Sequence, residues 1–295
     1  MPEPPGRFVT VDGDRLHVVD EGSGAPLLLM AALGSNWFDL DPLATRLVIR
    51  GWRVIRYDRP GYGLSDSVRR GRVPTLDAEI SRMSEVLASL GVTAPVTLVG
   101  HSMASLYVEG FARAHPSNTA GVVILDGSYV LVPWRLVPAR FRVGNAHRAM
   151  SAVRAVGDRT RIRIRGRGRL RTKVLPAPPE GFDANQHFWG DHFFGSAGFV
   201  LATLVENAAF PTINASLRRL RRTRPMPAVP VIVVAALSGM PAWQRFWRAK
   251  QRRYADVVGG RLRTVEARHF LVLEKPDEVA DIVGEVWLDG RAPQL

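Results

Sequence analysis

Gly100-His101-Ser102-Met103-Ala104 is the stretch of this sequence that decides the fold. It follows the apolar run 96–99 and precedes a helix-like segment, 105–115. A serine at a sharp turn between a buried strand and a helix is held out of the sheet. The N–H of the next residue and the positive end of the helix dipole then lie beside it. The hydroxyl of Ser102 is therefore a candidate nucleophile, although alanine replaces the last glycine of the pattern G-x-S-x-G.

Apolar runs of strand length recur on both sides of this turn, with helical patterns between them. A hairpin is expected over 7–21, and the later strand-like runs are 26–31, 52–57, 95–100, 121–125, 230–236 and 261–265. From Thr75 to Leu90, apolar residues at helical spacing predict an amphipathic helix that Thr75 caps. Strands that alternate with helices are typical of an α/β fold. We therefore expect a mostly parallel sheet covered by helices on both faces.

The alternation stops after Asp126 and resumes at Pro230. Arginines and clustered aromatic residues fill the interval, and no strand–helix rhythm is visible there. We interpret 129–225 as an insertion between two core strands, and 1–128 together with 226–295 as the core.

The formal net charge of +13 is concentrated in this insertion. Thirteen basic residues and one acid lie between Arg135 and Lys173, and 218–224 adds five arginines, so the rest of the chain is mildly acidic. Over 159–171 the arginines alternate with other residues. One interpretation is a solvated, compositionally biased loop; the other is attraction of an anionic substrate or an anionic membrane surface. Nucleic-acid binding is disfavoured, because no aromatic residues are interleaved to stack on bases.

The composition is that of an ordinary globular protein, with 46% hydrophobic and 23% charged residues in 295. The absence of cysteine excludes disulfides and thiolate metal sites. The first six residues lack the pattern of a signal peptide, and the longest apolar stretches, 27–33 and 229–237, are too short to cross a bilayer. We expect a soluble, cytoplasmic protein.

A nucleophilic serine needs a general base, and His269 is the best candidate. It comes directly after the last strand-like run, so it can reach over the carboxyl edge of the sheet, where ligands of open α/β sheets bind. His17 and His115 lie in the hairpin and at the end of the helix after Ser102, and the backbone of His101 is committed to the turn. These three histidines fit the role of base less well.

Several motifs occur in an order that resembles the α/β-hydrolase family across nearly the whole chain. They are Leu28-Leu29-Met30-Ala31-Ala32-Leu33-Gly34-Ser35, Tyr57-Asp58-Arg59-Pro60-Gly61-Tyr62-Gly63-Leu64-Ser65-Asp66, Gly100-His101-Ser102, and His269 with Phe270 and Pro276. The resemblance implies an α/β-hydrolase fold in which 129–225 forms a helical, Arg-rich cap over the active site.

The resemblance also implies a third catalytic residue, an acid that orients the histidine. Many members place it after the strand at 231–236, but no carboxylate occurs between that strand and Asp256. Asp126, at the end of the preceding strand, matches the position from which some similar members recruit it. A carboxylate there would bond His269 Nδ1–H and stabilise the imidazolium. Alternatively, Asp126 only caps its loop, whereas Asp256 is expected on the helix before the last strand.

The oxyanion loop departs from the family's H-G-x pattern, since Met30 and Ala31 occupy the His-Gly positions. Because the chemistry needs only backbone donors, the N–H groups of Ala32 (or of Leu33, if the register slips) and Met103 are expected to bind the oxyanion.

These residues predict a serine hydrolase that cleaves a carboxylic ester through an acyl-enzyme, with Ser102, His269 and Asp126 as its catalytic residues and no cofactor or metal. Family members that are epoxide hydrolases or dehalogenases resemble one another in carrying aspartate where this chain has Ser102. Amide, thioester and C–C cleavage use the same machinery and stay open as alternatives. Two further alternatives are a non-hydrolytic protein that binds a small ligand and a basic protein that binds anionic surfaces with a vestigial pocket.

Overall fold

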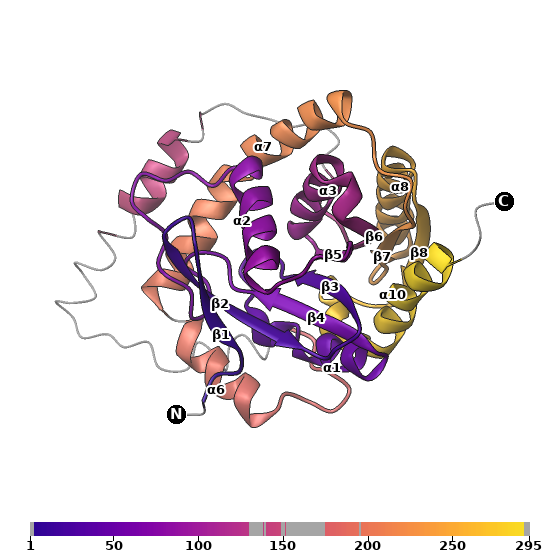
Figure 1. Cartoon of the computed structure of the whole chain (residues 1–295), viewed down its shortest axis with the longest axis horizontal. Coiled ribbons are helices and arrows are strands. Elements are labelled where there is room, and N and C mark those ends of the chain that lie inside the picture. The colour runs from indigo at the N-terminus through magenta and orange to yellow at the C-terminus, as the bar shows by residue number, and fades with distance from the viewer. Residues whose placement is uncertain are drawn as a thin grey trace.

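The structure, a computed structural model, describes residues 3–129, 138, 140–148, 151, 175–194 and 196–291, with the backbone alone for 288–291. Its sheet has eight strands in the order β1-β2-β4-β3-β5-β6-β7-β8 (Figure 1). The strands are β1 (Arg7–Val11), β2 (Asp14–Glu21), β3 (Ala25–Met30), β4 (Trp52–Tyr57), β5 (Val96–His101), β6 (Thr119–Leu125), β7 (Val231–Ala236) and β8 (Arg261–Val265). Among the strands that the structure describes, only the pairs β1·β2 and β2·β4 are antiparallel. The prediction of a mostly parallel sheet is confirmed.

Helices cover both faces of this sheet. They are α1 (Asp41–Ile49), α2 (Leu76–Ser89), α3 (Ala104–Ala114), α6 (Ala184–Phe193), α7 (Ala197–Thr223), α8 (Pro241–Val258), α9 (Leu271–Glu274) and α10 (Pro276–Arg291), with the short 3-10 helices η1 (Trp37–Asp39) and η2 (Pro116–Asn118). Residues 140–148 are also helical.

The pleat of β3 divides the core into two apolar layers. Leu28 and Met30 pack on one face with side chains of α2, α3, α7 and α8. Leu27 and Leu29 pack on the other face with side chains of α1, α9 and α10. Figure 1 shows the same division, with α2 and α3 on one side of the sheet and α1 and α10 on the other. Because successive side chains of a strand point to opposite faces, a strand covered on both faces must be apolar throughout.

Helix α2 begins where the sequence predicts it. The Thr75 hydroxyl accepts a hydrogen bond from the N–H of Ala78 at 3.1 Å, which satisfies one of the unpaired donors of the first turn. Ile80, Met83 and Leu87 are buried along one face. The helix ends at Ser89 with Leu90 as its C-cap, and Gly91 follows with a φ of +67°, which suits a residue without a Cβ.

Helices α6 and α7, which lie between β6 and β7, pack over the loops at the carboxyl edge of the sheet. Trp189 and Phe193 of α6 make ring contacts with Trp37 in the loop after β3. Phe199 of α7 packs edge-on against Tyr62 in the loop after β4. The clustered aromatic residues of the insertion thus bury themselves against the core. The Arg-rich stretch 159–171 lies outside the described residues, and the boundaries at 128 and 226 stay predictions.

Among the described helices, none is by itself long and apolar enough to span a membrane, although α6 and α7 pass that test when taken together as a bent pair.

Candidate active site

Ser102 lies in the sharp turn between β5 and α3. Its φ of +54° belongs to the left-handed region, which costs a non-glycine residue free energy and marks a backbone that its surroundings hold in place. The Ser102 N–H donates to the C=O of Leu125 at 2.8 Å, and the Ser102 C=O accepts from the N–H of Ser128 at 3.2 Å. Gly100 allows the turn, because a Cβ there would lie 2.7 Å from Val108 and 2.8 Å from the Ala104 carbonyl oxygen.

Ala104, where the pattern has glycine, and Ser105, which follows it, both fit into this turn. Ala104 and Ser105 are fully buried. The Ser105 hydroxyl accepts from the N–H of Ser128 at 3.1 Å and so joins the start of α3 to the loop after β6. The departure from G-x-S-x-G therefore leaves the strained turn intact.

The structure brings Ser102, His269 and Asp126 together at the carboxyl edge of the sheet. They follow β5, β8 and β6, which run parallel, so their loops emerge on the same side. His269 Nδ1 lies 2.6 Å from Asp126 Oδ2, and His269 Nε2 lies 2.9 Å from Ser102 Oγ. With the Nδ1 proton donated to the carboxylate, Nε2 is free to accept the serine proton. The side chain of His269 is 44% exposed, whereas that of Asp126 is 3% exposed.

Asp126 itself is fixed by two further donors. Its Oδ1 accepts from the backbone N–H of Ala236 at 3.0 Å and from the indole N–H of Trp247 at 2.5 Å. Its φ of +46° also lies in the left-handed region. Two donors on one carboxylate oxygen leave the other oxygen aimed at His269. Sequence reasoning missed Trp247, which lies on α8; its spacing from Asp126 carries no motif that could have revealed it. Asp256, also on α8, is exposed.

His101 supports the loop that carries His269. Its Nε2–H donates to the backbone C=O of His269 at 2.8 Å, and the two rings lie 5.0 Å apart. Burial, with the adjacent His269, lowers the pKa of His101 to about 3. The imidazole of His101 is therefore neutral at ordinary pH and serves as a fixed donor.

The expected oxyanion donors lie at the start of α3 and in the loop after β3. Met103 is the N-cap residue of α3, so its N–H belongs to the positive end of that helix. Within the described part of the chain, no group accepts from the N–H of Ala32 or of Met103. The carbonyl groups of Ala31 and Ala32 are both engaged, since Arg59 donates to them at 2.7 and 3.0 Å.

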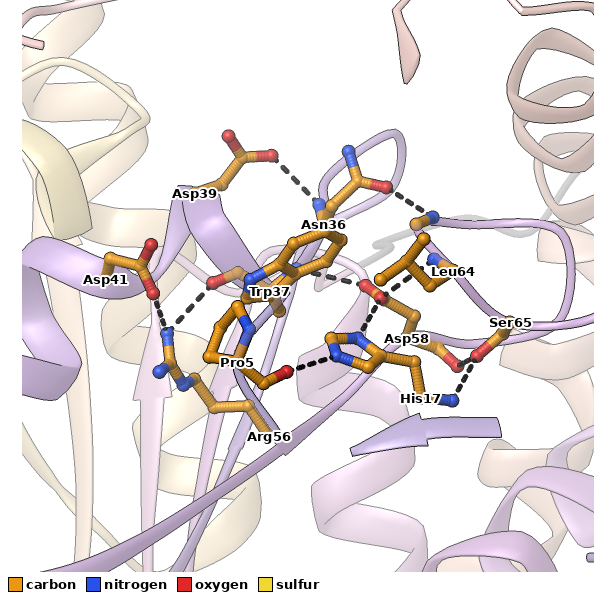
Figure 2. Close-up of polar contacts among 11 residues, drawn as sticks. Pro5, His17, Asn36, Trp37, Asp39, Asp41, Arg56, Asp58, Leu64 and Ser65 are labelled. Atoms are coloured by element: carbon orange, nitrogen blue, oxygen red, sulfur yellow. Dashed lines mark hydrogen bonds and ion pairs between the residues drawn. The ribbon is translucent and has the colours of Figure 1, made fainter. Parts of the chain in front are cut away.

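Asp58 holds the far end of the same loop. Its carboxylate accepts from the N–H of Trp37 at 3.0 Å, from His17 Nδ1 at 2.9 Å and from the N–H of Leu64 at 3.3 Å (Figure 2). Gly63 passes so close to this carboxylate that a Cβ at position 63 would lie only 2.0 Å from Asp58 Oδ2, so no larger residue fits there. His17 is thus a buried structural residue that joins the hairpin to the loops after β3 and β4.

A cavity of about 80 Å³ lies behind Arg59, between α2 and α7, and its lining includes Tyr107, Glu79 and Glu206. None of Ser102, His269 and Asp126 lines it. Across the described residues, no three His, Asp or Glu side chains gather as ligands for a metal ion.

Comparison with known proteins gives the family. The profile described as the alpha/beta hydrolase family matches residues 22–282, most of the chain. The chain belongs to the alpha/beta hydrolase family. Within the described residues it has the eight-stranded sheet and the flanking helices that its sequence predicts.

Similar proteins carry several activities. The chain is 33% identical over 130 residues to a 2-hydroxy-6-oxononadienedioate/2-hydroxy-6-oxononatrienedioate hydrolase of Cupriavidus pinatubonensis, a match that covers 41% of this chain and 44% of that protein. It is 32% identical over 120 residues to bifunctional epoxide hydrolase 2 of Rattus norvegicus, covering 40% and 22%. The matched stretch thus spans less than half the length of these curated relatives. A solved carboxylesterase structure from Nitrososphaera gargenis is similar in fold, with a TM-score of 0.63, 20% identity, and coverage of 96% of this chain and 98% of that one.

Proposed function

We propose that this chain is a serine hydrolase that cleaves carboxylic esters through an acyl-enzyme intermediate. The observation that carries the proposal is the hydrogen-bonded series Ser102–His269–Asp126, with distances of 2.9 and 2.6 Å. Nucleophile, base and orienting acid in this geometry are the requirements of nucleophilic acyl transfer.

The reaction follows from these contacts. Ser102 Oγ attacks the ester carbonyl carbon while His269 Nε2 takes its proton, and Asp126 stabilises the imidazolium that forms. The carbonyl oxygen becomes an oxyanion that accepts from the N–H groups of Ala32 and Met103. Collapse of this intermediate breaks the bond to the alcohol, which leaves with the proton from His269. Water then attacks the acyl-enzyme by the same route, so that the acid is released and Ser102 is restored.

The chemistry of the nucleophile favours an acyl substrate over an epoxide. A carboxylate that opens an epoxide forms an ester, which water can cleave. A serine hydroxyl would form an ether, which this site has no means to hydrolyse. Ser102 stands at the turn, so acyl transfer is the reaction that closes a catalytic cycle here. Small-molecule esters are the proposed substrates.

The first test is covalent labelling followed by a substrate series. A fluorophosphonate probe should label wild-type protein and leave Ser102→Ala unlabelled, because only an activated serine reacts readily. A series of neutral esters with increasing acyl length should then give a defined optimum. Protein that is folded yet resists the probe and turns over no ester would instead favour a non-hydrolytic, ligand-binding role.

Ser102 and His269 should behave as one unit. Replacing either by alanine should lower kcat by on the order of 10³-fold or more, and the double variant should lose little beyond that. Steady-state kinetics of the two single variants and the double variant check this expectation. Additive losses, or near-normal turnover in either single variant, would contradict the assignment.

A further inference from the structure

Glu206, on α7, is a buried carboxylate that accepts four hydrogen bonds from the core. Arg59 donates to it through Nε at 2.7 Å and through Nη2 at 3.0 Å. The hydroxyls of Tyr62 and Tyr107 donate at 2.8 and 2.9 Å. All four side chains are at most 7% exposed. Burial, together with the charge of Glu206, raises the pKa of both tyrosines, so both remain protonated donors.

The remaining donors of Arg59 reach the loop after β3. Nη1 donates to the C=O of Ala31 at 2.7 Å, and Nη2 donates to the C=O of Ala32 at 3.0 Å. Tyr62 contacts the same loop, because its hydroxyl accepts from the N–H of Gly34 at 3.4 Å. One carboxylate on α7 thus fixes a guanidinium and a phenol that both hold this short loop.

The peptide bond between Ala31 and Ala32 gives this contact a consequence for catalysis. The C=O of Ala31 and the N–H of Ala32 belong to one planar trans unit, so they point in opposite directions. A guanidinium that fixes the C=O therefore fixes the direction of the N–H. The positive charge of the Arg59 guanidinium, which donates to the Ala31 carbonyl oxygen, also polarises the unit and strengthens the N–H as a donor.

We infer that Arg59, held by Glu206, is a positioning residue that aims the N–H of Ala32 at the oxyanion. The inference rests on the proposed function, and it assigns to α7 a part in forming the oxyanion site. Asp58, the neighbour of Arg59, holds the other end of the loop at Trp37 (Figure 2). Consecutive residues of the loop after β4 thus hold the two ends of the oxyanion loop.

The test is Glu206→Gln, which keeps the shape of the side chain and removes its charge and one acceptor oxygen. We expect kcat for a neutral ester to fall about 10- to 100-fold while KM changes less than about threefold, because an oxyanion donor acts mainly in the transition state. Amide hydrogen exchange should accelerate in the peptide that contains residues 31–35. Tyr107→Phe, which removes one of the four donors, should give the same pattern with a smaller loss of kcat, and it serves if Glu206→Gln does not fold.

Glu109→Gln is the matched control. Glu109 is fully buried and accepts from Arg113, from Arg221 of α7 and from the hydroxyl of Tyr254. It therefore resembles Glu206 in burial, in partners and in its link to α7, but it does not touch the loop after β3. Both variants should have a lower melting temperature, because each loses a buried carboxylate that is paired with arginine. In Glu109→Gln, however, kcat and exchange at 31–35 should stay close to wild type.

Two results would overturn the inference: unchanged exchange at 31–35 in Glu206→Gln, or equal loss of kcat in Glu206→Gln and Glu109→Gln. If the proposed function itself is wrong, the result is different: the wild-type protein then hydrolyses the ester no faster than Ser102→Ala does. That result removes the catalytic part of the inference, and hydrogen exchange still decides whether Arg59 and Glu206 position the loop.

Discussion

Asp126 joins the proposed catalytic series Ser102–His269–Asp126 to the sheet. The N–H of Ala236, in the next strand, and the indole of Trp247 bind Oδ1, and His269 binds Oδ2. Its backbone N–H donates to Val234 at 2.8 Å. A carboxylate with this many fixed partners can hold the ring of His269 in one tautomer and one orientation.

Asp126→Asn should therefore keep the fold and lose activity. An amide donor facing His269 would favour the wrong tautomer, and kcat is expected to fall by up to about 10⁴-fold. Asp256→Asn is the matched control, because Asp256 is the same residue type on the exposed surface of α8 and should change kcat little. Kinetics on both variants, with unfolding curves to verify stability, check the expectation. The reverse ranking would remove Asp126 from the triad.

The buried His101 should make the free energy of unfolding depend on pH. Its pKa is lowered to about 3, mainly by burial, whereas an unfolded histidine titrates near 6.5. Between these values the unfolded chain binds a proton that the folded protein does not. The free energy of unfolding should thus fall by about 1.4 kcal/mol per pH unit from this group as the pH is lowered through that window.

His101→Gln should make this dependence shallower. Glutamine keeps an N–H donor for the C=O of His269 and does not titrate. Urea unfolding of both proteins at several pH values from 4.5 to 7 gives the two slopes. The carboxylates and the neighbouring His269 are common to both proteins, so the difference between the slopes reports on His101. Equal slopes would show that the pKa of His101 is the same in the folded and the unfolded protein, and that burial does not lower it.

At the scale of helices and strands, the sequence predicts the features that depend on local periodicity, such as strand bounds and helix caps. The strands β4 and β8 have the predicted bounds, and the cap of α2 by Thr75 is as expected. The paired ends of β5 and β6, where His101 lies opposite Leu125, place Ser102 and Asp126 side by side. A motif indicates Ser102, whereas Asp126 is indicated only by its position at the end of a strand-like run.

Contacts between distant elements left no such pattern. Trp247 is 121 positions from Asp126, and Glu206 is 147 positions from Arg59. Each pair meets only because a helix outside the motifs packs against a loop inside them. Arg59 was visible within the motif 57–66, but its task depends on the carbonyl groups of Ala31 and Ala32, which the sequence cannot orient. Tertiary packing, and not residue type, creates these roles.

Helix α8 contributes through the hydrogen bond from Trp247 to Asp126, and the variant Trp247→Phe tests whether that bond matters for catalysis. Phenylalanine keeps the aromatic packing and removes the N–H that donates to Asp126 Oδ1. A hydrogen bond to a charged group contributes about 1.5–3 kcal/mol, so kcat should fall roughly tenfold or more if the bond matters chiefly in the transition state. Trp243→Phe is the control, since Trp243 is 53% exposed on the same helix and stacks on Trp247 without reaching Asp126. Equal kcat in both variants would mean that Trp247 only packs.

At the scale of the whole molecule, the proposed catalytic geometry does not explain the distribution of charge. The net charge is +13, and its excess lies in the insertion. Many arginines of the described core are paired with acids, among them Arg53 with Asp20, Arg59 with Glu206 and Arg263 with Glu285. Paired charges cancel at a distance, so the stretch 159–171 should dominate any long-range attraction of anions.

Replacing Arg161, Arg163, Arg165 and Arg167 by glutamine should weaken kcat/KM for an anionic ester, or binding to vesicles that contain anionic lipid. Turnover of a neutral ester should stay the same. The wild-type preference for the anionic partner should also fade with added salt, because exposed charges act over about 10 Å at 0.1 M.

The matched control replaces Arg245, Arg248, Arg252 and Arg253 on α8. These four side chains are exposed, and none forms an ion pair with the residues that the structure describes. Both variants lose the same charge, so an effect confined to the first assigns the attraction to the stretch itself. Equal losses in the two variants would assign it to net charge. If neither added salt nor the first variant changes anionic-ester turnover or vesicle binding, the hypothesis that 159–171 attracts anions is wrong. The interpretation as a solvated loop then stands.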